Sequence, residues 1–342
     1  MDRKRILGQF FTKADLWLKP QVIDFIKNSK CSIAYDPFAG GGDLLKSAVE
    51  KCDNINEAEG LDIDDKLNWK INDSLISIPH LENAIIITNP PYISNYSAAR
   101  KKIDADLRKY FDNSYYSDLY LIALERMLSA QKFVVAIIPE TFINSNFAIK
   151  NRLKSITILE ENPFEDTDTP VIVACFDGKN KDFSEIKVYK NEKFVSTLAR
   201  AEQLRLSPSG RTPMSFNNKS GWLAVRCVDT TNPAVMISFD LKERMKYDWE
   251  NRIKVSSRLL TLIEIDVPEP KREEFIAECN SILLKAREES GDIILSPFKG
   301  NMKDGRRRRR LDFRACRAII ELAHNKVNNK ENKNVAKQQI LL

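Results

Sequence analysis

Ser-Ile-Ala-Tyr-Asp-Pro-Phe-Ala-Gly-Gly-Gly-Asp, residues 32–43, is the stretch that decides the fold. An apolar segment that we predict as a strand, 32–35, runs into three consecutive glycines, and a helical pattern begins at Asp43, which we expect to cap that helix. Glycines let the chain turn sharply and let a ligand approach the backbone, at the strand edge where open α/β sheets bind cofactors. An ordinary tight turn also explains this motif when it is taken alone.

The rest of the first half alternates short apolar runs with longer amphipathic stretches. This alternation is typical of βα units that feed a parallel sheet. We therefore predict an α/β fold with a doubly wound, mostly parallel sheet. Its expected strands are 32–35, 58–61, 84–88, 133–138 and 171–176, and its expected helices are 20–28, 43–51 and 117–130.

The pattern changes after Asp177 and Gly178, where short mixed segments follow without a second βαβ series. We place a domain boundary there, which divides the chain into residues 1–179 and 180–342. The second domain is predicted to be mixed α/β, with amphipathic helices at 271–289 and 311–326 and a polar, fraying tail at 325–342.

Composition and charge narrow the class of protein. The 342 residues are 43% hydrophobic and 30% charged, which fits a globular protein and excludes collagen-like or low-complexity chains. No apolar run approaches the ~20 residues that a bilayer crossing needs, and the first residues lack a signal peptide, so we expect a cytoplasmic protein without membrane contact. Six scattered cysteines and two histidines form no C-x-x-C pair, so neither a metal site nor a disulfide framework is expected.

Charge is divided unequally along the chain. Residues 1–178 carry a net charge of −5 and residues 179–342 a net charge of +11. This asymmetry indicates that the first half holds a small ligand while the second half contacts a polyanion. A well-solvated charged surface is the alternative explanation for either half.

Two acids follow the glycine motif in the order that a nucleoside-binding sheet requires. Asp62 ends an apolar strand 26 residues after Asp36, where a carboxylate can accept hydrogen bonds from ribose hydroxyls. Asp73 follows the next apolar patch, near the expected base of the cofactor. Either acid alone is also explained as a surface carboxylate or helix cap.

Asn89-Pro90-Pro91-Tyr92 follows the apolar run 84–88 and carries the strongest chemical signal. Two prolines fix two φ angles, so the turn after this buried strand is rigid. The side-chain oxygen of Asn89 and the carbonyl of Pro90 can hold the two hydrogens of an exocyclic amine, which localises the lone pair on nitrogen. Tyr92 offers a face on which a base can stack.

These motifs together resemble the adenine-specific DNA methyltransferases that use S-adenosylmethionine, with the cofactor motifs first and the target recognition domain last. The resemblance covers about the first half of the chain and includes Gly8 to Thr12 and the strand motif at 134–139. It implies a Rossmann-like methyltransferase fold, a catalytic domain at 1–179, a DNA recognition domain at 180–342 and a modification enzyme of a type II restriction-modification system. A cognate endonuclease that shares the recognition sequence is implied as a possible partner, without a stable complex.

The resemblance also implies which residues form the site. It assigns catalysis to Asn89, Pro90 and Tyr92, and it places Phe164 on the other face of a flipped adenine, although a plain core aromatic explains Phe164 equally well. The cofactor-binding positions that it implies are Thr12, Asp36, Phe38, Gly40, Gly42, Asp62, Asp73 and Asn89.

Basic clusters are the expected contacts to double-stranded DNA. The run Arg306, Arg307, Arg308, Arg309, Arg310 is the densest positive charge in the chain, and we expect some of these arginines to contact phosphates. Arg100, Lys101 and Lys102 follow the catalytic turn and can track the backbone beside the flipped base. A solvated basic surface is the alternative for both clusters.

Three other functions stay open from the sequence. The same tetrapeptide occurs in enzymes that methylate a glutamine amide of a protein, and related enzymes act on RNA adenines. The basic second half argues against the amide substrate but not against structured RNA. A nucleic-acid-binding module with an inactive methyltransferase fold is the third alternative.

Overall fold

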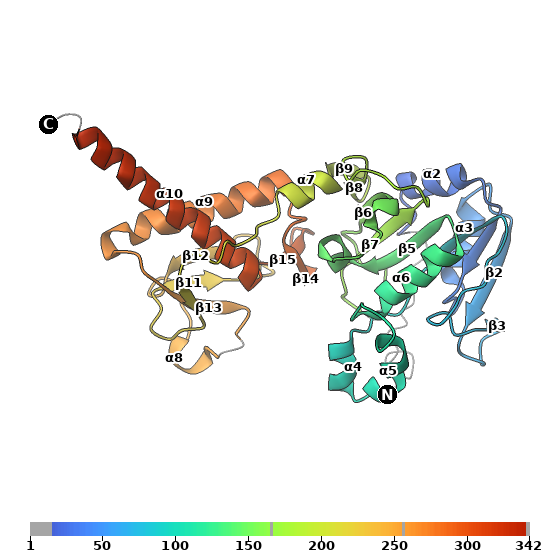
Figure 1. Cartoon of the computed structure of the whole chain (residues 1–342). Helices are drawn as coiled ribbons and strands as arrows, with labels where there is room; N and C mark the ends of the chain where they lie inside the picture. The colour runs from blue at the N-terminus through green and yellow to red at the C-terminus, as the bar shows by residue number, and fades with distance from the viewer. Residues whose placement is uncertain (1–15, 165–166, 255–256, 340–342) are drawn as a thin grey trace. The chain divides into compact units, whose positions relative to one another are not determined.

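Strands joined by helices fill the first of the two units into which the chain divides, Met1–Ala199 and Arg200–Leu342 (Figure 1). The computed structural model describes residues 16–164, 167–254 and 257–339. The strands of the first unit are β1 (Ile33–Asp36), β2 (Glu57–Asp62), β3 (Lys70–Ile71), β4 (Ala84–Thr88), β5 (Val134–Pro139), β6 (Leu153–Ile158), β7 (Val171–Phe176), β8 (Lys187–Lys190) and β9 (Lys193–Thr197). Its helices are α2 (Pro20–Ser29), α3 (Asp43–Lys51), α4 (Asn95–Lys101), α5 (Asp104–Phe111), α6 (Leu119–Ala130) and the 3₁₀ turns Glu140–Asn144 and Lys150–Arg152, and α7 (Leu198–Gln203) spans the boundary.

Within the described residues these strands form one sheet in the order β3-β2-β1-β4-β5-β7-β6-β8-β9. The pairs from β3 to β5 are parallel, whereas β7 runs antiparallel to both β5 and β6. The chain starts at β1, winds outward to β3 and returns to β4 on the other side of β1. The predicted doubly wound, mostly parallel, Rossmann-like sheet is therefore confirmed.

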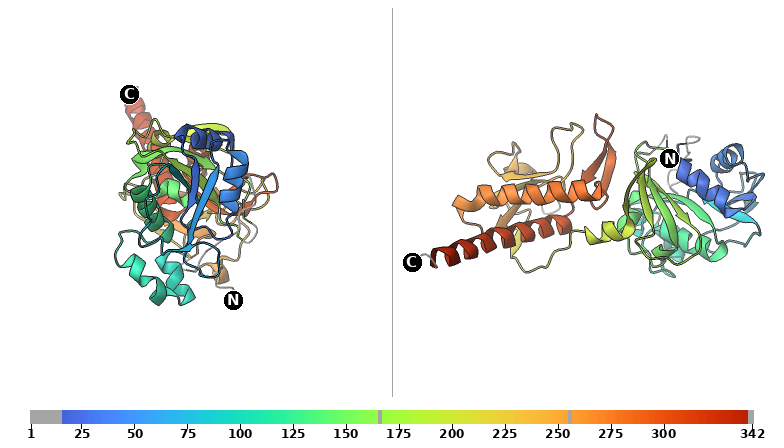
Figure 2. Two further views of the ribbon diagram at one scale, coloured as in Figure 1. Left: turned by 90° about the vertical axis from the view of Figure 1, so that its right-hand side faces the viewer. Right: turned by 90° about the horizontal axis from the view of Figure 1, so that it is seen from above.

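Both faces of the sheet are buried. Side chains alternate between the two faces along each strand, so neighbouring residues contact different layers. Ile85 and Ile87 of β4 belong to a core with residues of α2 and α3, while Ile86 between them is equally buried on the opposite face. On that opposite face, α6 packs against β5. The three layers can be followed in Figure 2. Burial of both faces explains why β4 and β5 read as continuous apolar runs.

The order of the strands fixes where a ligand can bind. The strand order reverses between β1 and β4, and the carboxyl ends of adjacent parallel strands lie at one edge of the sheet. Open α/β sheets bind ligands in the crevice at such a reversal. Asp36 ends β1, Asp62 ends β2 and Asn89 follows β4, so the sheet brings these three residues to the same edge.

The boundary predicted at residue 179 is corrected by the sheet. β8 pairs with β6 and β9 pairs with β8, so the first unit continues to Ala199. β8 and β9 form a hairpin that extends the sheet, and no helix lies in the described residues between β7 and β8. The helical pattern that marks a further βα unit is therefore missing from the sequence. Asp43 also differs from its prediction: Gly42, at φ 81°, occupies the cap position, and Asp43 is the first residue of α3.

The second unit is built on an antiparallel sheet. Among the residues described, its strand order is β10-β13-β11-β12, and α9 and α10 supply the other side of a core that includes Trp222, Phe275 and Leu311. Its elements are β10 (Met214–Phe216), β11 (Leu223–Arg226), β12 (Ser238–Leu241), α8 (Trp249–Arg252), β13 (Leu260–Ile265), the 3₁₀ turn Glu269–Lys271, α9 (Arg272–Ser290), β14 (Ser296–Asn301), β15 (Arg307–Arg310) and α10 (Phe313–Gln339). The two predicted helices are confirmed, and α10 extends through most of the stretch that we expected to fray.

A buried carboxylate, Asp229, ties three parts of the second unit together. Its two carboxylate oxygens accept hydrogen bonds from Arg287 of α9 at 2.9 and 3.0 Å, and also from the backbone N–H groups of Ile237 and Arg309. The carbonyl oxygen of Asp229 accepts a bond from Nε of Arg308 at 2.8 Å. Burial alone raises the pKa of Asp229, but the bonds from Arg287 and the two backbone groups outweigh burial and hold the pKa below its usual value.

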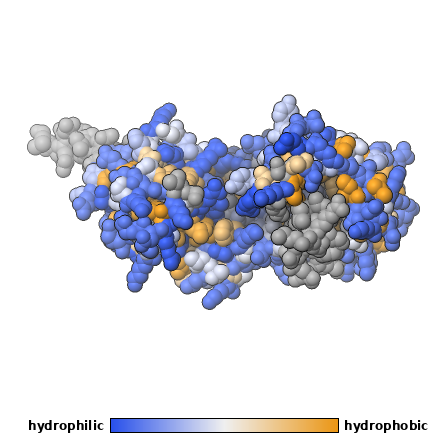
Figure 3. Space-filling view, turned by 90° about the horizontal axis from the view of Figure 1, so that it is seen from below, coloured by the Kyte–Doolittle hydropathy of each residue, from blue (hydrophilic) through white to orange (hydrophobic). Residues whose placement is uncertain are grey.

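The surface of the described residues is mostly hydrophilic, with small apolar patches on the face that Figure 3 shows. All six cysteines lie in the described ranges, and each is buried with a free thiol. In those ranges no helix is long and apolar enough to cross a membrane. Nor do three or more His, Cys, Asp or Glu side chains of the described residues cluster so that they could hold a metal ion.

Candidate active site

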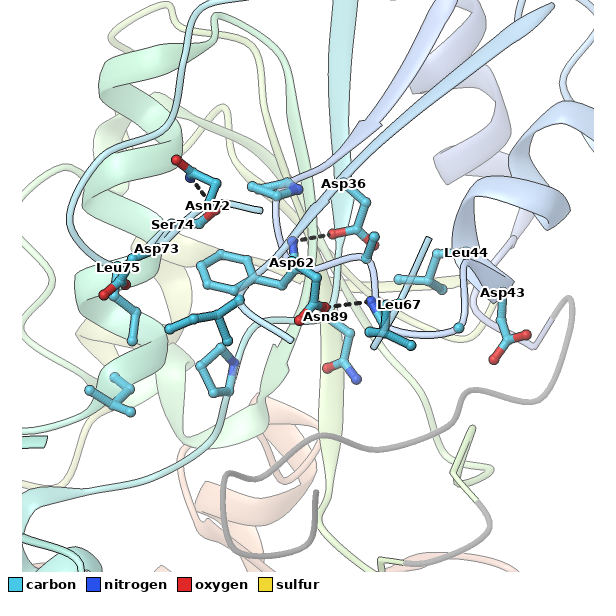
Figure 4. Close-up of a pocket in the computed structure, with 18 of the residues that line it drawn as sticks. Asp36, Asp43, Leu44, Asp62, Leu67, Asn72, Asp73, Ser74, Leu75 and Asn89 are labelled. Carbon is cyan, nitrogen blue, oxygen red and sulfur yellow. Dashed lines mark hydrogen bonds between the residues drawn. The ribbon is translucent and has the colours of Figure 1, made fainter. Parts of the chain in front are cut away.

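A pocket opens at the carboxyl edge of the first sheet, where the strand order reverses. It encloses about 1110 Å³, its open mouth included, and it contains six of the predicted cofactor-binding residues. Figure 4 shows Asp62 and Asn89 near its centre, with Asp73 and Asp43 on opposite sides. The six predicted residues that line it are Asp36, Phe38, Gly40, Asp62, Asp73 and Asn89.

Asp36 is buried at the base of this pocket. Its Oδ1 accepts hydrogen bonds from Oγ1 of Thr88 at 2.5 Å and from the backbone N–H of Phe38 at 2.9 Å. Burial raises the pKa of Asp36 to about 7, these two bonds oppose the rise, and the neighbouring Asp62 carboxylate adds to it. Asp36 therefore fixes the start of the glycine turn and joins it to the end of β4.

The raised pKa of Asp36 gives a pH-dependent stability. Because the folded-state pKa lies above the unfolded value of about 4, this group favours folding most at pH below 4, and its contribution is lost as pH rises through about 7. Relative to Asp36→Asn, the wild type should lose up to about 1.4 kcal/mol per pH unit within this window. Urea unfolding at each pH measures the difference, and Asp43→Asn, an exposed acid beside the same turn, is the control that should leave the profile unchanged. Parallel profiles for wild type and Asp36→Asn would contradict the assignment.

Asp62 holds the glycine turn from the neighbouring strand. Its Oδ2 accepts a hydrogen bond from the N–H of Gly40 and its Oδ1 one from the N–H of Asp64, both at 2.9 Å. Gly40 has φ +51°, and a Cβ at this position would meet no atom within 4 Å. The turn therefore presents open space and two carboxylate oxygens whose remaining lone pairs can accept hydroxyl groups.

Trp69 packs under this turn. Its Nε1 donates to the carbonyl of Gly40 at 2.9 Å. A Cβ at Gly60 would lie 2.4 Å from the Trp69 ring, and a Cβ at Gly42 would lie 2.9 Å from it. The indole thus requires glycine at both positions, and the positive φ of Gly42 in the turn requires it there independently.

Asp73 lies in the loop that follows β3. Its Oδ2 accepts hydrogen bonds from Nζ of Lys109 at 2.9 Å and from the hydroxyl of Tyr110 at 2.8 Å, both on α5. The apolar side chains of Ile63 and Leu107 line the same pocket. This combination of a carboxylate beside apolar walls suits a heterocyclic base with an amino group.

The catalytic turn joins the pocket through Asn89. The hydroxyl of Tyr92 shares its one proton between two acceptors, the side-chain oxygen of Asn89 and the carbonyl of Ile137 in β5, the latter at 2.7 Å. Desolvation raises the pKa of Tyr92 well above its ordinary value, so the hydroxyl keeps its proton. An amide oxygen has two lone pairs and accepts up to two hydrogen bonds.

Phe164 packs in the core of the first unit, 3% exposed, with its ring centroid 6.2 Å from that of Tyr92 and the planes at 67°. In this arrangement the two rings do not present parallel faces to an intercalated base. Its stacking on a flipped base therefore stays a prediction, as does the role of Thr12, which lies outside the described residues.

The structure separates the five consecutive arginines. They lie on a strand and its preceding turn, where side chains alternate between faces, so Arg307 and Arg309 are buried at 5% and 1% exposure. Some of the five arginines were expected to contact phosphates; burial removes Arg307 and Arg309 from the candidates, and phosphate contact by Arg306, Arg308 and Arg310 stays a prediction. In the cluster at 100–102, Arg100 and Lys102 are exposed at the end of α4, and Lys101 lies on the same helix.

Sequence reasoning missed several residues that line this pocket or hold its walls, four of which matter for the site. They are Ile63, Trp69, Lys109 and Tyr110. Ile63 could have been predicted, because an apolar side chain between two acids at a strand end suggests contact with an apolar part of a ligand. The other three lie far in sequence from the groups that they contact, and no spacing pattern connects them.

Comparison with protein families matches residues 11–166 to the family described as Eco57I restriction-modification methylase. A comparison with curated proteins gives no match.

Solved structures with a similar arrangement include methyltransferases of several kinds. A structure described as a class I S-adenosylmethionine-dependent methyltransferase from Listeria monocytogenes has 12% identity over 49% of this chain and 63% of that chain, with a TM-score of 0.35. A type I restriction-modification methyltransferase subunit from Streptococcus thermophilus has 16% identity over 58% of this chain and 52% of that chain, with a TM-score of 0.37. The M protein of the type I restriction enzyme EcoKI has 14% identity over 80% and 70%, with a TM-score of 0.33. The chain thus spans less than two thirds of the first two structures.

Proposed function

We propose that this chain is a DNA methyltransferase that uses S-adenosylmethionine and modifies the 6-amino group of adenine, since residues 11–166 match the family described as Eco57I restriction-modification methylase. The observation that carries the proposal is the position of Asn89, which lies both in the nucleoside-sized pocket and in the rigid turn with Tyr92.

The residues of the pocket fit S-adenosylmethionine. Asp62 would accept bonds from the ribose hydroxyls, Asp73 would accept one from the adenine amino group, and the open backbone at Gly40 admits the rest of the cofactor. When bound, the cofactor supplies a methyl group on a sulfonium, whose neutral thioether leaving group requires no metal.

Asn89 and Pro90 act on the substrate amine. The adenine amine has its lone pair delocalised into the ring, and two acceptors on its two hydrogens localise that pair on nitrogen. The side-chain oxygen of Asn89 and the carbonyl of Pro90 are the proposed acceptors. The turn is held before substrate arrives, because Tyr92 anchors it to β5 through Ile137, so orientation costs little at the moment of reaction.

The substrate base must leave the DNA stack to reach Asn89. Extrusion of a base costs a few kcal/mol in lost stacking and pairing, which contacts to the extruded base and to the flanking backbone offset. We assign a share of the backbone contacts to the second unit, since residues 200–342 carry 28 lysines and arginines against 19 acids. The outward residues of the β14–β15 ribbon are its candidates, and a two-stranded ribbon is one of the elements that fit the DNA major groove.

Salt dependence of DNA binding tests this ribbon. We expect replacement of exposed Lys303 and Arg306 by Ser to lower DNA affinity and to reduce the slope of log K against log salt by up to about 2, since each lost phosphate contact removes about 0.9. The matched control removes two exposed positive charges from the region of α8, by Arg252→Ser and Lys254→Ser. An equal fall in both double variants would mean that the ribbon contributes only through net charge.

Methyl transfer to three substrates tests the function itself. Purified chain is incubated with labelled S-adenosylmethionine and, in parallel, unmethylated genomic DNA, total RNA or a cell protein extract, and the labelled nucleosides or amino acids are identified. We expect 6-methyladenine in DNA at a restricted set of sites. Label in RNA or in glutamine alone would overturn the substrate, and binding of DNA without any label would indicate an inactive module.

The proposed biological setting is a restriction-modification system. Sites that this chain methylates would then be protected from an endonuclease with the same recognition sequence. Digestion of methylated DNA with candidate nucleases of matching specificity tests that setting once the sites are known.

A further inference from the structure

One oxygen of Asp73 receives both of the hydrogen bonds that its side chain accepts in the described part of the chain. Lys109 and Tyr110, neighbours on α5, both donate to Oδ2. The carboxylate is therefore rotated so that Oδ1 is the oxygen left for a further donor. An ionised carboxylate only accepts hydrogen bonds, so the ligand group that contacts Oδ1 must be an N–H or O–H group.

The loop that carries Asp73 is itself held in place. The N–H of Asn72 donates to the carbonyl of Asp62, and the side chain of Asn72 donates to Ser74 and to the carbonyl of Ser77, all at 2.9 Å. The carbonyl of Asp73 accepts from the N–H groups of Ile76 and Ser77. With the backbone fixed on the β2 side, the side-chain torsions of Asp73 are set by the two donors on α5.

The two donors differ in burial. Tyr110 is 8% exposed and lines the pocket, so its bond to Asp73 is shielded from water. The side chain of Lys109 is 55% exposed, and its ion pair is partly screened by solvent. The hydrogen bond from Lys109 to Asp73 raises the pKa of the lysine, so the ammonium stays charged at neutral pH.

We propose that Lys109 and Tyr110 are positioning residues that orient Asp73 toward the 6-amino group of the cofactor's adenine, and that this pair makes the pocket selective for adenine over hypoxanthine. The inference rests on the proposed use of S-adenosylmethionine. Hypoxanthine carries a carbonyl oxygen in place of the amino group, and two acceptors that face each other repel. If the Asp73 carboxylate can rotate away from the base, this repulsion is relieved and the preference for adenine over hypoxanthine falls.

The position of α5 links the contact between Asp73 and its two donors to the rest of the site. α4 and α5 form the segment between the catalytic turn and α6, so the same insertion that follows Tyr92 also supplies a wall of the cofactor pocket through Leu107 and Tyr110. A purely structural tie between α5 and the loop after β3 is the competing explanation. It predicts equal losses of affinity for both bases.

Equilibrium binding without DNA separates the two explanations. The probes are S-adenosylhomocysteine and its inosine counterpart, measured by calorimetry on the full chain. We expect the wild type to prefer the adenosyl compound by at least about 100-fold, since a hydrogen bond to a charged group is replaced by an acceptor pair. Tyr110→Phe should reduce this ratio about 5- to 10-fold, and Lys109→Met about 2- to 3-fold, the latter more at low salt.

Controls and contradicting results are available in the same chain. Tyr115→Phe and Arg108→Met alter an exposed tyrosine and an exposed basic residue of the same segment and should leave the ratio unchanged. Asp73→Asn, whose amide can donate, should shift the ratio toward the inosyl compound even if it weakens both. A fall in both affinities at a constant ratio in Tyr110→Phe would overturn the positioning role. Failure of the wild type to bind either compound would instead overturn the proposed function.

Discussion

Asn89→Ala is expected to lower kcat for methyl transfer by about 1000-fold or more, while the affinity for S-adenosylhomocysteine changes by no more than about threefold. Removal of one preorganised electrostatic contact to the reacting group typically costs about 100- to 1000-fold in rate. The loss is expected at the upper end, because Asn89 is at the same time the acceptor for Tyr92. Its removal therefore also loosens the turn.

Single-turnover rates with saturating DNA and cofactor are the appropriate measurement for Asn89→Ala, because product release then has no influence. Asn95→Ala, an exposed asparagine at the start of α4, is the matched control and should retain the wild-type rate. Transfer by Asn89→Ala within tenfold of wild type would remove Asn89 from the catalytic site. A large loss of cofactor affinity with an unchanged single-turnover rate would assign Asn89 to cofactor binding instead.

Asp229→Ala is expected to destabilise the second unit by about 3–5 kcal/mol. Breaking a buried ion pair by removing one partner leaves the other charge, here Arg287, with Asp292, a partly exposed carboxylate, in place of two. The backbone N–H groups of Ile237 and Arg309 lose their acceptor at the same time. Amide hydrogen exchange resolved by peptide should show faster exchange in residues 200–339 and unchanged exchange in the described residues up to 199.

The acid side of the stability profile provides an independent check on Asp229. Because its pKa in the folded chain is lowered, its contribution is present above the unfolded value of about 4 and is lost as pH falls through the lower folded value. The wild type should therefore converge toward Asp229→Ala under strongly acidic conditions. Asp304→Asn, which removes an exposed partner of Arg306, should not change exchange in either unit. Equal exchange in Asp229→Ala and wild type would mean that Asp292 alone compensates the charge of Arg287.

The sequence predicts those features of the fold that arise from local patterning. The strands at 84–88 and 171–176 and the helix at 43–51 begin and end at the predicted residues, because each is a strongly periodic or strongly apolar segment with a clear breaker. The six pocket residues were found for a related reason: glycines, acids and the Asn-Pro-Pro-Tyr turn stand directly at strand ends. Because β2, β1 and β4 are adjacent parallel strands, their carboxyl ends lie together at one edge of the sheet.

The parts that the sequence could not predict depend on distant partners. Five arginines in a row have no internal pattern, and only the position of Asp229, far back in the chain, decides that Arg309 turns inward. Likewise, nothing in the sequence around Lys109 and Tyr110 predicts their contact with Asp73. The hairpin of β8 and β9 escaped because its strands are short, charged and exposed on one side, as edge strands commonly are.

Trp69 gives the glycine turn an optical signal. Its indole N–H is bonded to the carbonyl of Gly40, and its ring lies against Gly42 of the turn and Gly60 of β2, so a ligand seated there alters the polarity around a fluorophore. The other tryptophans, Trp17, Trp222 and Trp249, are nearly fully buried and supply a steady background. Emission from the unlabelled chain can thus follow occupancy of the pocket in real time, in a stopped-flow instrument and without a reporter group.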